Sequence, residues 1–282
     1  KAKVPAFGYT TIRITEGEKD SFCFAALPPD PRVTYYEPLV MENELVRVQF
    51  NESDLSVSSY YDKRTGCDLL SKEGAHFVLH RERTLKGGSA WVEGVHKTPL
   101  NLNRQADVTL KEINLHTPLR QSLCYEIKYG KSKLEVTAQL SDDSAVLEFS
   151  VKCDWMETAS PDDVPVLSFA APLAYHTAVY RSDIQIGLLD RHSEIMHDSC
   201  SRNFYFAPNT GSMPGLLLLT DSKYGYRGFE DTLQVTLLRS SSNPDPYPEL
   251  GVSHFRFGLS CEQDDAFALK AAGDLFVNRD LP

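Results

Sequence analysis

The chain has 282 residues, of which 41% are hydrophobic and 24% charged. This composition is typical of a soluble globular protein with one large domain, or one large domain plus a fragment. The formal net charge of −10 excludes a nucleic-acid-binding protein, which needs a basic face. Because no apolar run approaches the roughly 18 residues of a membrane span, no membrane association is predicted.

The first residues are strand-like, with the sequence VPAFGYTTIRI and no apolar signal core. A charged segment with four prolines follows and ends at Pro38. We therefore expect an N-terminal strand, then a linker, then the main body of the protein.

Alternating apolar and polar residues begin in the segment 44–50, where Val46, Val48 and Phe50 alternate with Arg47 and Gln49. This period of two predicts a strand with one buried face. The next segment, LSVSSYYDKRTGCDLL, predicts two strands joined by a turn that contains a glycine suited to positive φ.

The central part of the chain predicts an antiparallel meander. Its three strands lie within 122–129, 133–140 and 146–154, and short polar turns separate them. In the first strand, for example, Leu123 and Ile127 share the expected inward face.

The remaining chain is also mostly strand-like, in the segments 203–207, 215–219, 232–239 and 253–259. A single helix is predicted over 264–272, with Gly273 as its C-terminal stop. So many strands require two packed sheets, so the predicted fold class is all-β.

The six cysteines contain no CxxC pair and several lie in alternating strand patterns, which favours a reducing compartment and a cytoplasmic location. Paired carboxylates such as Asp142-Asp143 lie at predicted turns, where they cap backbone N–H groups or face water. His192 and His197 lie near acidic residues, but their spacing fits a surface loop better than a metal site. No metal site and no catalytic residue is therefore predicted.

The segment LLLLTDSKYGYRGFED, residues 216–231, is the main candidate for ligand binding. An apolar strand leads directly into Asp221, Tyr224, Tyr226 and Arg227. If the chain stays extended, both tyrosines point to the same side, where aromatic rings and charged groups suit a sugar. The alternative is a hairpin tip held by Asp221 and by tyrosine packing.

We expect the two tryptophans to lie in different environments. Trp155 follows an alternating strand and is predicted to be in the core. Trp91 lies in the glycine-containing loop LKGGSAWVEG and is either an exposed sugar platform or a plug between domains.

Five motifs in the same order resemble the C-terminal β-domain of glycoside hydrolase family 38, the α-mannosidases, most closely its cytosolic and bacterial branch. They are MENELVRVQFNE with SVSSYYDKRTGCDLL, TPLRQSLCYEIKYGKSKLEVTAQL, LEFSVKCDWME, LLTDSKYGY with TLQVTLLRS, and PDPYPELGVSHFRFGL. The resemblance covers nearly the whole chain, although the segment Asp190–Gly211 departs from the family pattern.

The resemblance implies a galactose mutarotase-like β-supersandwich over residues 39–282. Residues 1–20 would be the terminal strand of a preceding small β-domain, and residues 21–38 a linker. It also implies a retaining exo-α-mannosidase that removes terminal mannose from oligosaccharides. The zinc, nucleophile and acid/base of such an enzyme lie on an N-terminal catalytic domain, which would be this chain's partner in the same polypeptide. The chain alone is expected to be inactive and to hold no cofactor.

Arg239 ends a predicted strand and, by the resemblance, matches an arginine of the family that reaches the catalytic pocket. It could bind mannose hydroxyls or form an ion pair with the catalytic domain. Two other functions stay open: a stand-alone carbohydrate-binding or scaffold module, and an aldose epimerase. The linkage preference and the oligomeric state, including a homo-oligomer, also stay open.

Overall fold

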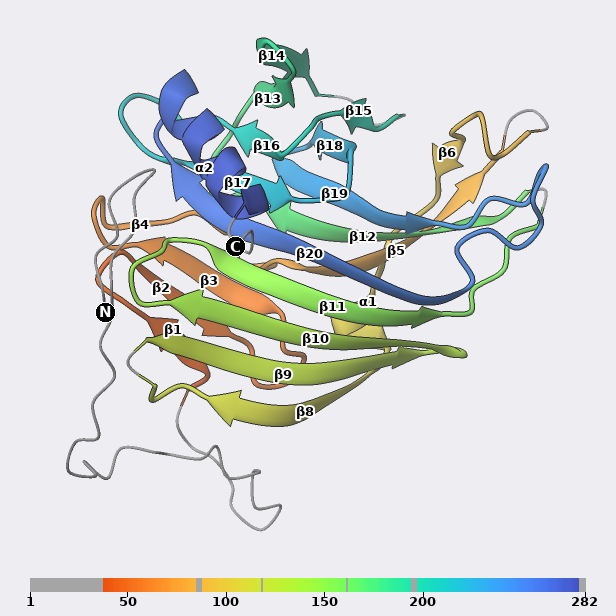
Figure 1. Ribbon diagram of the computed structural model, residues 1–282, viewed down its shortest axis with the longest axis horizontal. Coiled ribbons are helices and arrows are strands. Elements are labelled where there is room, and N and C mark those ends of the chain that lie inside the picture. The colour runs from red at the N-terminus through yellow and green to blue at the C-terminus, as the bar shows by residue number, and fades with distance from the viewer. Residues whose placement is uncertain (1–37, 85–87, 118, 161, 194–196, 279–282) are drawn as a thin grey trace, which may run out of the picture.

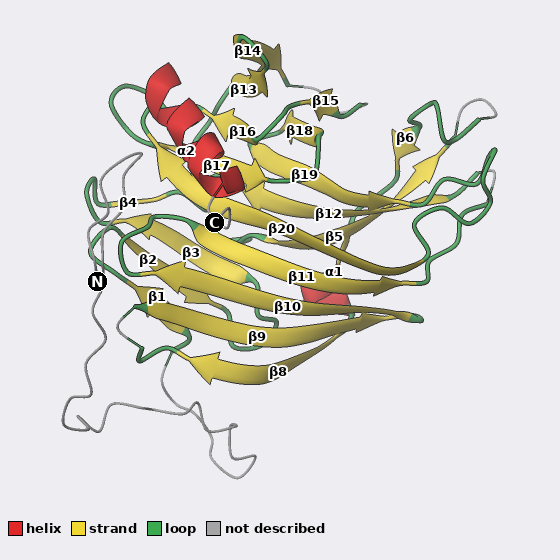
Figure 2. Cartoon of the chain, viewed as in Figure 1, coloured by secondary structure: helices red, strands yellow, loops and turns green. Residues whose placement is uncertain are grey.

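The structure is a computed structural model that describes residues 38–84, 88–117, 119–160, 162–193 and 197–278. The expected N-terminal strand and all but the last residue of the expected linker lie outside these residues. Strands dominate the described chain (Figure 2). They are β1 (Val40–Glu42), β2 (Val46–Phe50), β3 (Val57–Asp62), β4 (Cys67–Asp68), β5 (His76–Arg83), β6 (Val95–His96), β7 (Leu100–Asn101), β8 (Asp107–Asn114), β9 (Arg120–Tyr129), β10 (Ser132–Ser141), β11 (Leu147–Trp155), β12 (Val164–Pro172), β13 (Val179–Ile184), β14 (Gly187–His192), β15 (Ser199–Cys200), β16 (Phe204–Ala207), β17 (Gly215–Thr220), β18 (Gly225–Phe229), β19 (Thr232–Arg239) and β20 (Gly251–Glu262). The helices are α1 (Leu102–Gln105) and α2 (Ala266–Asn278).

The strands of the described chain form three antiparallel sheets (Figure 1). The large sheet has the order β14-β13-β16-β17-β20-β11-β10-β9-β8, and the small sheet has the order β1-β2-β3-β4. The third sheet, which we call the site sheet, has the order β15-β18-β19-β12-β5-β6, with β7 also paired to β5. Isolated bridges between Val57 and Ala75 and between Leu70 and Leu173 link the small sheet to the site sheet.

One hydrophobic core joins all three sheets. Its centre is a cluster of phenylalanines in which Phe77 and Phe169 come from the site sheet and Phe149 and Phe257 from the large sheet. The predicted meander is confirmed as β9, β10 and β11, with continuous antiparallel register. The alternation of β2 is confirmed as well, because Val46, Val48 and Phe50 are buried.

Two central strands, β5 and β12, have no counterpart in the sequence analysis. All nine residues of β12 are buried, and so are the first five residues of β5. A strand buried on both faces has an almost continuous apolar sequence instead of an alternating one. The signal on which the strand predictions depend is therefore weak in β12, whereas β5 shows the alternation only in its second half, LHRER.

The predicted end of the C-terminal helix at Gly273 is wrong, because α2 continues to Asn278. A Cβ on Gly273 would lie 2.9 Å from the Phe204 ring, so this glycine allows close packing of the helix on the large sheet. Leu269 and Phe276 of α2 complete a second apolar cluster there. A glycine occurs at this position because the helix packs closely on the sheet, and not because the helix ends there.

Candidate functional site

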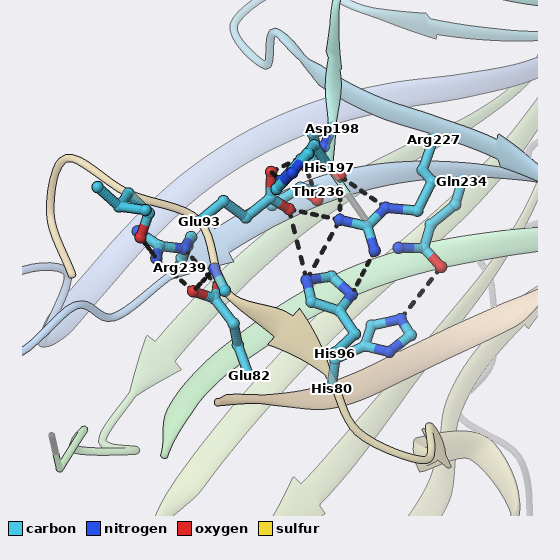
Figure 3. A network of polar contacts seen from close by, with 12 residues as sticks. His80, Glu82, Glu93, His96, His197, Asp198, Arg227, Gln234, Thr236 and Arg239 are labelled. Atoms are coloured by element: carbon cyan, nitrogen blue, oxygen red, sulfur yellow. Dashed lines mark hydrogen bonds and ion pairs between the residues drawn. The ribbon is translucent and has the colours of Figure 1, made fainter. Parts of the chain in front are cut away.

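A network of charged and polar side chains lies on the face of the site sheet that points away from the core (Figure 3). The alternation of β5 sends Phe77 and Leu79 into the core and leaves His80 and Glu82 for the opposite face. In the same way, β19 contributes Gln234 and Thr236, and β18 contributes Arg227. His96 from β6 and Glu93 and Asp198 from adjoining loops complete this set, which we call the polar network.

Arg227 is the centre of the polar network, and only 2% of its surface is exposed. Its guanidinium donates to both Glu93 and Asp198, with 3.0 Å between its Nε and Asp198 Oδ1. The Asp198 carboxylate also accepts from Thr236 Oγ1 at 2.5 Å. Burial, together with the nearby Asp198 charge, raises the pKa of Glu93. One cation therefore holds two carboxylates together in a poorly solvated place.

Two histidines of the polar network are held neutral. The Nδ1 atom of His96 lies 2.8 Å from Arg227 Nη1, and because a guanidinium only donates, this nitrogen must accept. Burial and the Arg227 charge lower the pKa of His96 to about 2. His80, whose ring centroid is 4.6 Å from that of His96, bonds Gln234 Oε1 through Nε2 at 3.1 Å. Burial lowers the pKa of His80 to about 4.

These two lowered pKa values predict an acid-sensitive fold. Since both folded-state values lie below the ordinary value of 6.5, the unfolded chain binds more protons below that pH, and stability falls as pH falls. We expect the free energy of unfolding to drop by about 1.4 kcal/mol per pH unit for each histidine between about pH 6.5 and 4. Urea midpoints measured across this range should show a shallower slope for His96→Gln than for the parent protein. Equal slopes for the parent and His96→Gln, with the exposed His176→Gln as the control, would contradict the prediction.

A second ion pair joins Arg239, at the end of β19, to Glu82 of β5. It is bidentate, with 2.7 Å from Arg239 Nε to Glu82 Oε2 and 2.7 Å from Nη2 to Oε1. Glu82 is fully buried, and its carboxylate also accepts the backbone N–H of Gly94. Arg239 additionally donates to the carbonyl oxygens of Ser89 and Val92 at 2.6 and 3.1 Å. The pair therefore fixes the loop 88–94 on the sheet.

The structure separates the five residues predicted for ligand binding. Tyr224 is exposed, whereas Tyr226 is fully buried, stacks on Tyr205 and bonds the Thr220 hydroxyl. The expectation that both tyrosines share a side is wrong, because one ring is exposed and the other is buried; Tyr224 lies before β18, which begins at Gly225. Asp221 accepts from Arg256 Nε at 3.1 Å, on the large sheet.

Only Arg227 and Arg239 of the five predicted residues belong to the site on the site sheet. The ion pair expected for Arg239 with another domain is, within this chain, a pair with Glu82. Sequence reasoning missed His80, Glu82, Glu93, His96 and Asp198. The segment LHRER, residues 79–83, contains a signal for two of them. His80 and Glu82 lie two residues apart, as residues on the same face of a strand do. Asp198 comes from the segment that departs from the family pattern and was interpreted as a plain loop.

In the described ranges, no three His, Cys, Asp or Glu side chains are grouped so that they could hold a metal ion. Trp155 is confirmed in the core, where its Nε1–H donates to Ser240 Oγ at 2.8 Å. Among the described helices, none is long and apolar enough to cross a membrane.

Comparisons with known proteins agree with this architecture. The sequence profile described as "Glycosyl hydrolases family 38 C-terminal domain" matches residues 41–247, well over half of the chain. No curated protein sequence matches. Among solved structures, an alpha-mannosidase from Enterococcus faecalis V583 is similar at a TM-score of 0.63 and 16% identity, over 80% of this chain and 30% of that chain.

Two further structures are similar at lower scores. The alpha-N-acetylgalactosaminidase NagBb from Bifidobacterium bifidum has a TM-score of 0.51 and 12% identity, over 85% of this chain and 39% of that chain. A galactose mutarotase-like protein from Lactobacillus casei ATCC 334 has a TM-score of 0.48 and 9% identity, over 80% of this chain and 100% of that chain. At 16% and 12% identity, the likeness to the mannosidase and to NagBb concerns the fold, and the predicted all-β class with large antiparallel sheets is confirmed. This chain spans about a third of the length of the mannosidase that it resembles. The profile match over residues 41–247 places it in the family: the chain belongs to the C-terminal domains of glycosyl hydrolase family 38.

Proposed function

We propose that this chain is the C-terminal part of a retaining exo-α-mannosidase that removes terminal mannose from oligosaccharides. The family match over residues 41–247 carries the proposal, together with the 30% share of the mannosidase chain that is covered. In such an enzyme, this domain packs on an N-terminal catalytic domain and forms one side of the active site. Residues 1–20 would be the terminal strand of a small β-domain that precedes this domain in the polypeptide.

The state of the carboxylates in the polar network supports this division of roles. A retaining glycosidase needs two carboxyl groups, about 5 Å apart, that face the sugar as nucleophile and acid/base. Here Glu82 is bound to Arg239, and Glu93 and Asp198 are both bound to Arg227. We assign to these ion-paired carboxylates the positioning of neighbouring groups. We assign the zinc ion of such an enzyme to the preceding domain, as the resemblance to the family implies.

The arrangement of the polar network favours a role in positioning. Glu82 and Arg239 fix one loop, and Arg227 ties a second loop, which contains Asp198, to the first. Loops held on a rigid sheet can keep a substrate in a reactive orientation, which contributes to rate without bond-making. We therefore propose that the surface formed by these loops faces the catalytic domain and the sugar.

The test is hydrolysis of 4-nitrophenyl α-mannoside in the presence of zinc. We expect activity in the longer polypeptide that includes the upstream sequence, at about a million-fold or more above the uncatalysed rate. The 282-residue chain alone should stay at background. The β-mannoside serves as the control for the anomer, and proton NMR of the first-formed mannose anomer tests retention. Activity of the short chain, or inactivity of both polypeptides, would contradict the proposal.

A further inference from the structure

Trp91 is the most conspicuous side chain near the polar network, because 77% of its surface is exposed. Tryptophan is a large apolar residue that is usually well buried, as Trp155 is in this chain. A single exposed apolar residue is ordinary on a mobile loop. An exposed indole on a rigidly held loop is different, because the loop is fixed by other contacts and the burial of the indole contributes nothing to its stability.

The loop that carries Trp91 is held by its own backbone. The N–H groups of Trp91 and Val92 both donate to the carbonyl of Gly88, at 2.9 and 3.1 Å. Gly88 has a φ of +87°, and a Cβ there would lie 2.9 Å from the Trp91 ring. Only glycine therefore combines this turn with a ring that lies directly against the backbone.

Two further sets of contacts fix the loop from outside. On one side, the ion pair of Glu82 and Arg239 holds the backbone of Ser89, Val92 and Gly94. On the other side, Ala90 N–H donates to Asn243 O at 2.9 Å, and the Ser89 hydroxyl accepts from the N–H groups that follow β19. The backbone that carries the indole is thus in place before any ligand arrives, which lowers the entropy that the loop would lose on binding.

We propose that Trp91 is a carbohydrate platform whose indole ring packs on the C–H face of a sugar in a mannose-containing oligosaccharide. The sugar class rests on the proposed function, whereas the platform itself rests on the exposure of the ring and on the rigid hold of the loop that carries it. An aromatic side chain such as Trp has roughly 150–250 Å² of surface that can be buried, and one face of the indole suits one sugar ring.

The two tryptophans of the chain allow a direct test by NMR. In a spectrum of the ¹⁵N-labelled 282-residue chain, the Trp91→Phe variant assigns the two indole N–H signals. We expect α-mannobiose to move the Trp91 signal saturably and to leave the Trp155 signal, which comes from the buried core, in place. Trp91→Ala should weaken binding about tenfold or more, whereas Trp91→Tyr should keep most of it. Tyr247→Ala, which removes another exposed aromatic side chain, is the matched control and should bind normally.

Several outcomes would overturn the inference. One is a Trp91 signal that no mannoside moves, and another is equal affinity of Trp91→Ala and the parent chain. A third is an indole that the longer polypeptide already shields from acrylamide without sugar, since Trp91 would then be a contact between domains. Hydrolysis by the longer polypeptide with an unmoved Trp91 signal would reject this inference and leave the proposed function standing. A Trp91 signal that responds to mannosides without any hydrolysis would support the platform and reject the enzyme.

Discussion

Replacing Arg227 by methionine is expected to lower the free energy of unfolding by about 3–5 kcal/mol. The methionine fills much of the same space, but Glu93 and Asp198 lose the cation that holds them together. Two carboxylates would then share a poorly solvated place without the arginine's charge, which is the main cause of the loss. Urea unfolding near neutral pH measures it directly.

The pH dependence of this variant provides an internal check. Because the pKa of Glu93 is already raised, this carboxyl is the first that can take up a proton when Arg227 is absent. The difference between Arg227→Met and the parent protein should therefore shrink as pH falls towards the raised pKa. Arg47→Met, which removes a half-exposed arginine from β2, is the control and should change stability by less than about 0.5 kcal/mol. A similarly small loss for Arg227→Met would mean that the polar network does not hold the site sheet together.

Truncation of Phe257 to alanine should cost about 3–5 kcal/mol of stability as well, for a different reason. The Phe257 ring lies between the two layers, with centroid distances of 4.9 Å to Phe149, 4.8 Å to Phe169 and 5.9 Å to Phe77. Its removal takes away contacts from both sheets and leaves a cavity that the rigid strands cannot close.

The matched control for Phe257 is Phe267→Ala on α2, where the ring is 84% exposed. This change should shift stability by no more than about 0.5 kcal/mol in either direction. Thermal or urea unfolding of the two variants measures the loss of stability in each. The difference between the two losses is the effect of burying the ring, because both variants lose the same side chain. Equal losses in the two variants would show that Phe257 is not at the centre of the core.

Family membership and local geometry give different information about the function of this site. Family membership concerns the whole domain and leaves individual roles open. The geometry divides the charged residues into two ion-paired groups, around Arg227 and Arg239, that hold loops in place. The proposed sugar contact is instead an apolar ring, Trp91, which one of these groups positions.

Local patterns in the sequence were sufficient for the strands with one buried face. In β9 and β10 the period of two places Leu123 and Leu134 on the core side, and the structure confirms both. This works because the pleat alone sends successive side chains to opposite faces. The glycine at the turn between β3 and β4 was also predictable, and Gly66 has a φ of +75°.

The polar network could not be assembled from the sequence, because its partners are far apart along the chain. Glu93 and Arg227 are separated by 134 residues, and Glu82 and Arg239 by 157. Which charges meet depends on the order β18-β19-β12-β5-β6, and hydrophobic periodicity does not encode strand order.

The sequence by itself determined the fold class, the central meander and the family of this protein, since each depends on patterns within short segments. Only the tertiary structure decided that Tyr226 is buried, that Arg239 pairs with Glu82, and that Trp91 is exposed. The physical reason is that burial and ion pairing are properties of neighbours in space. Those neighbours are fixed only when strands from distant parts of the chain lie side by side.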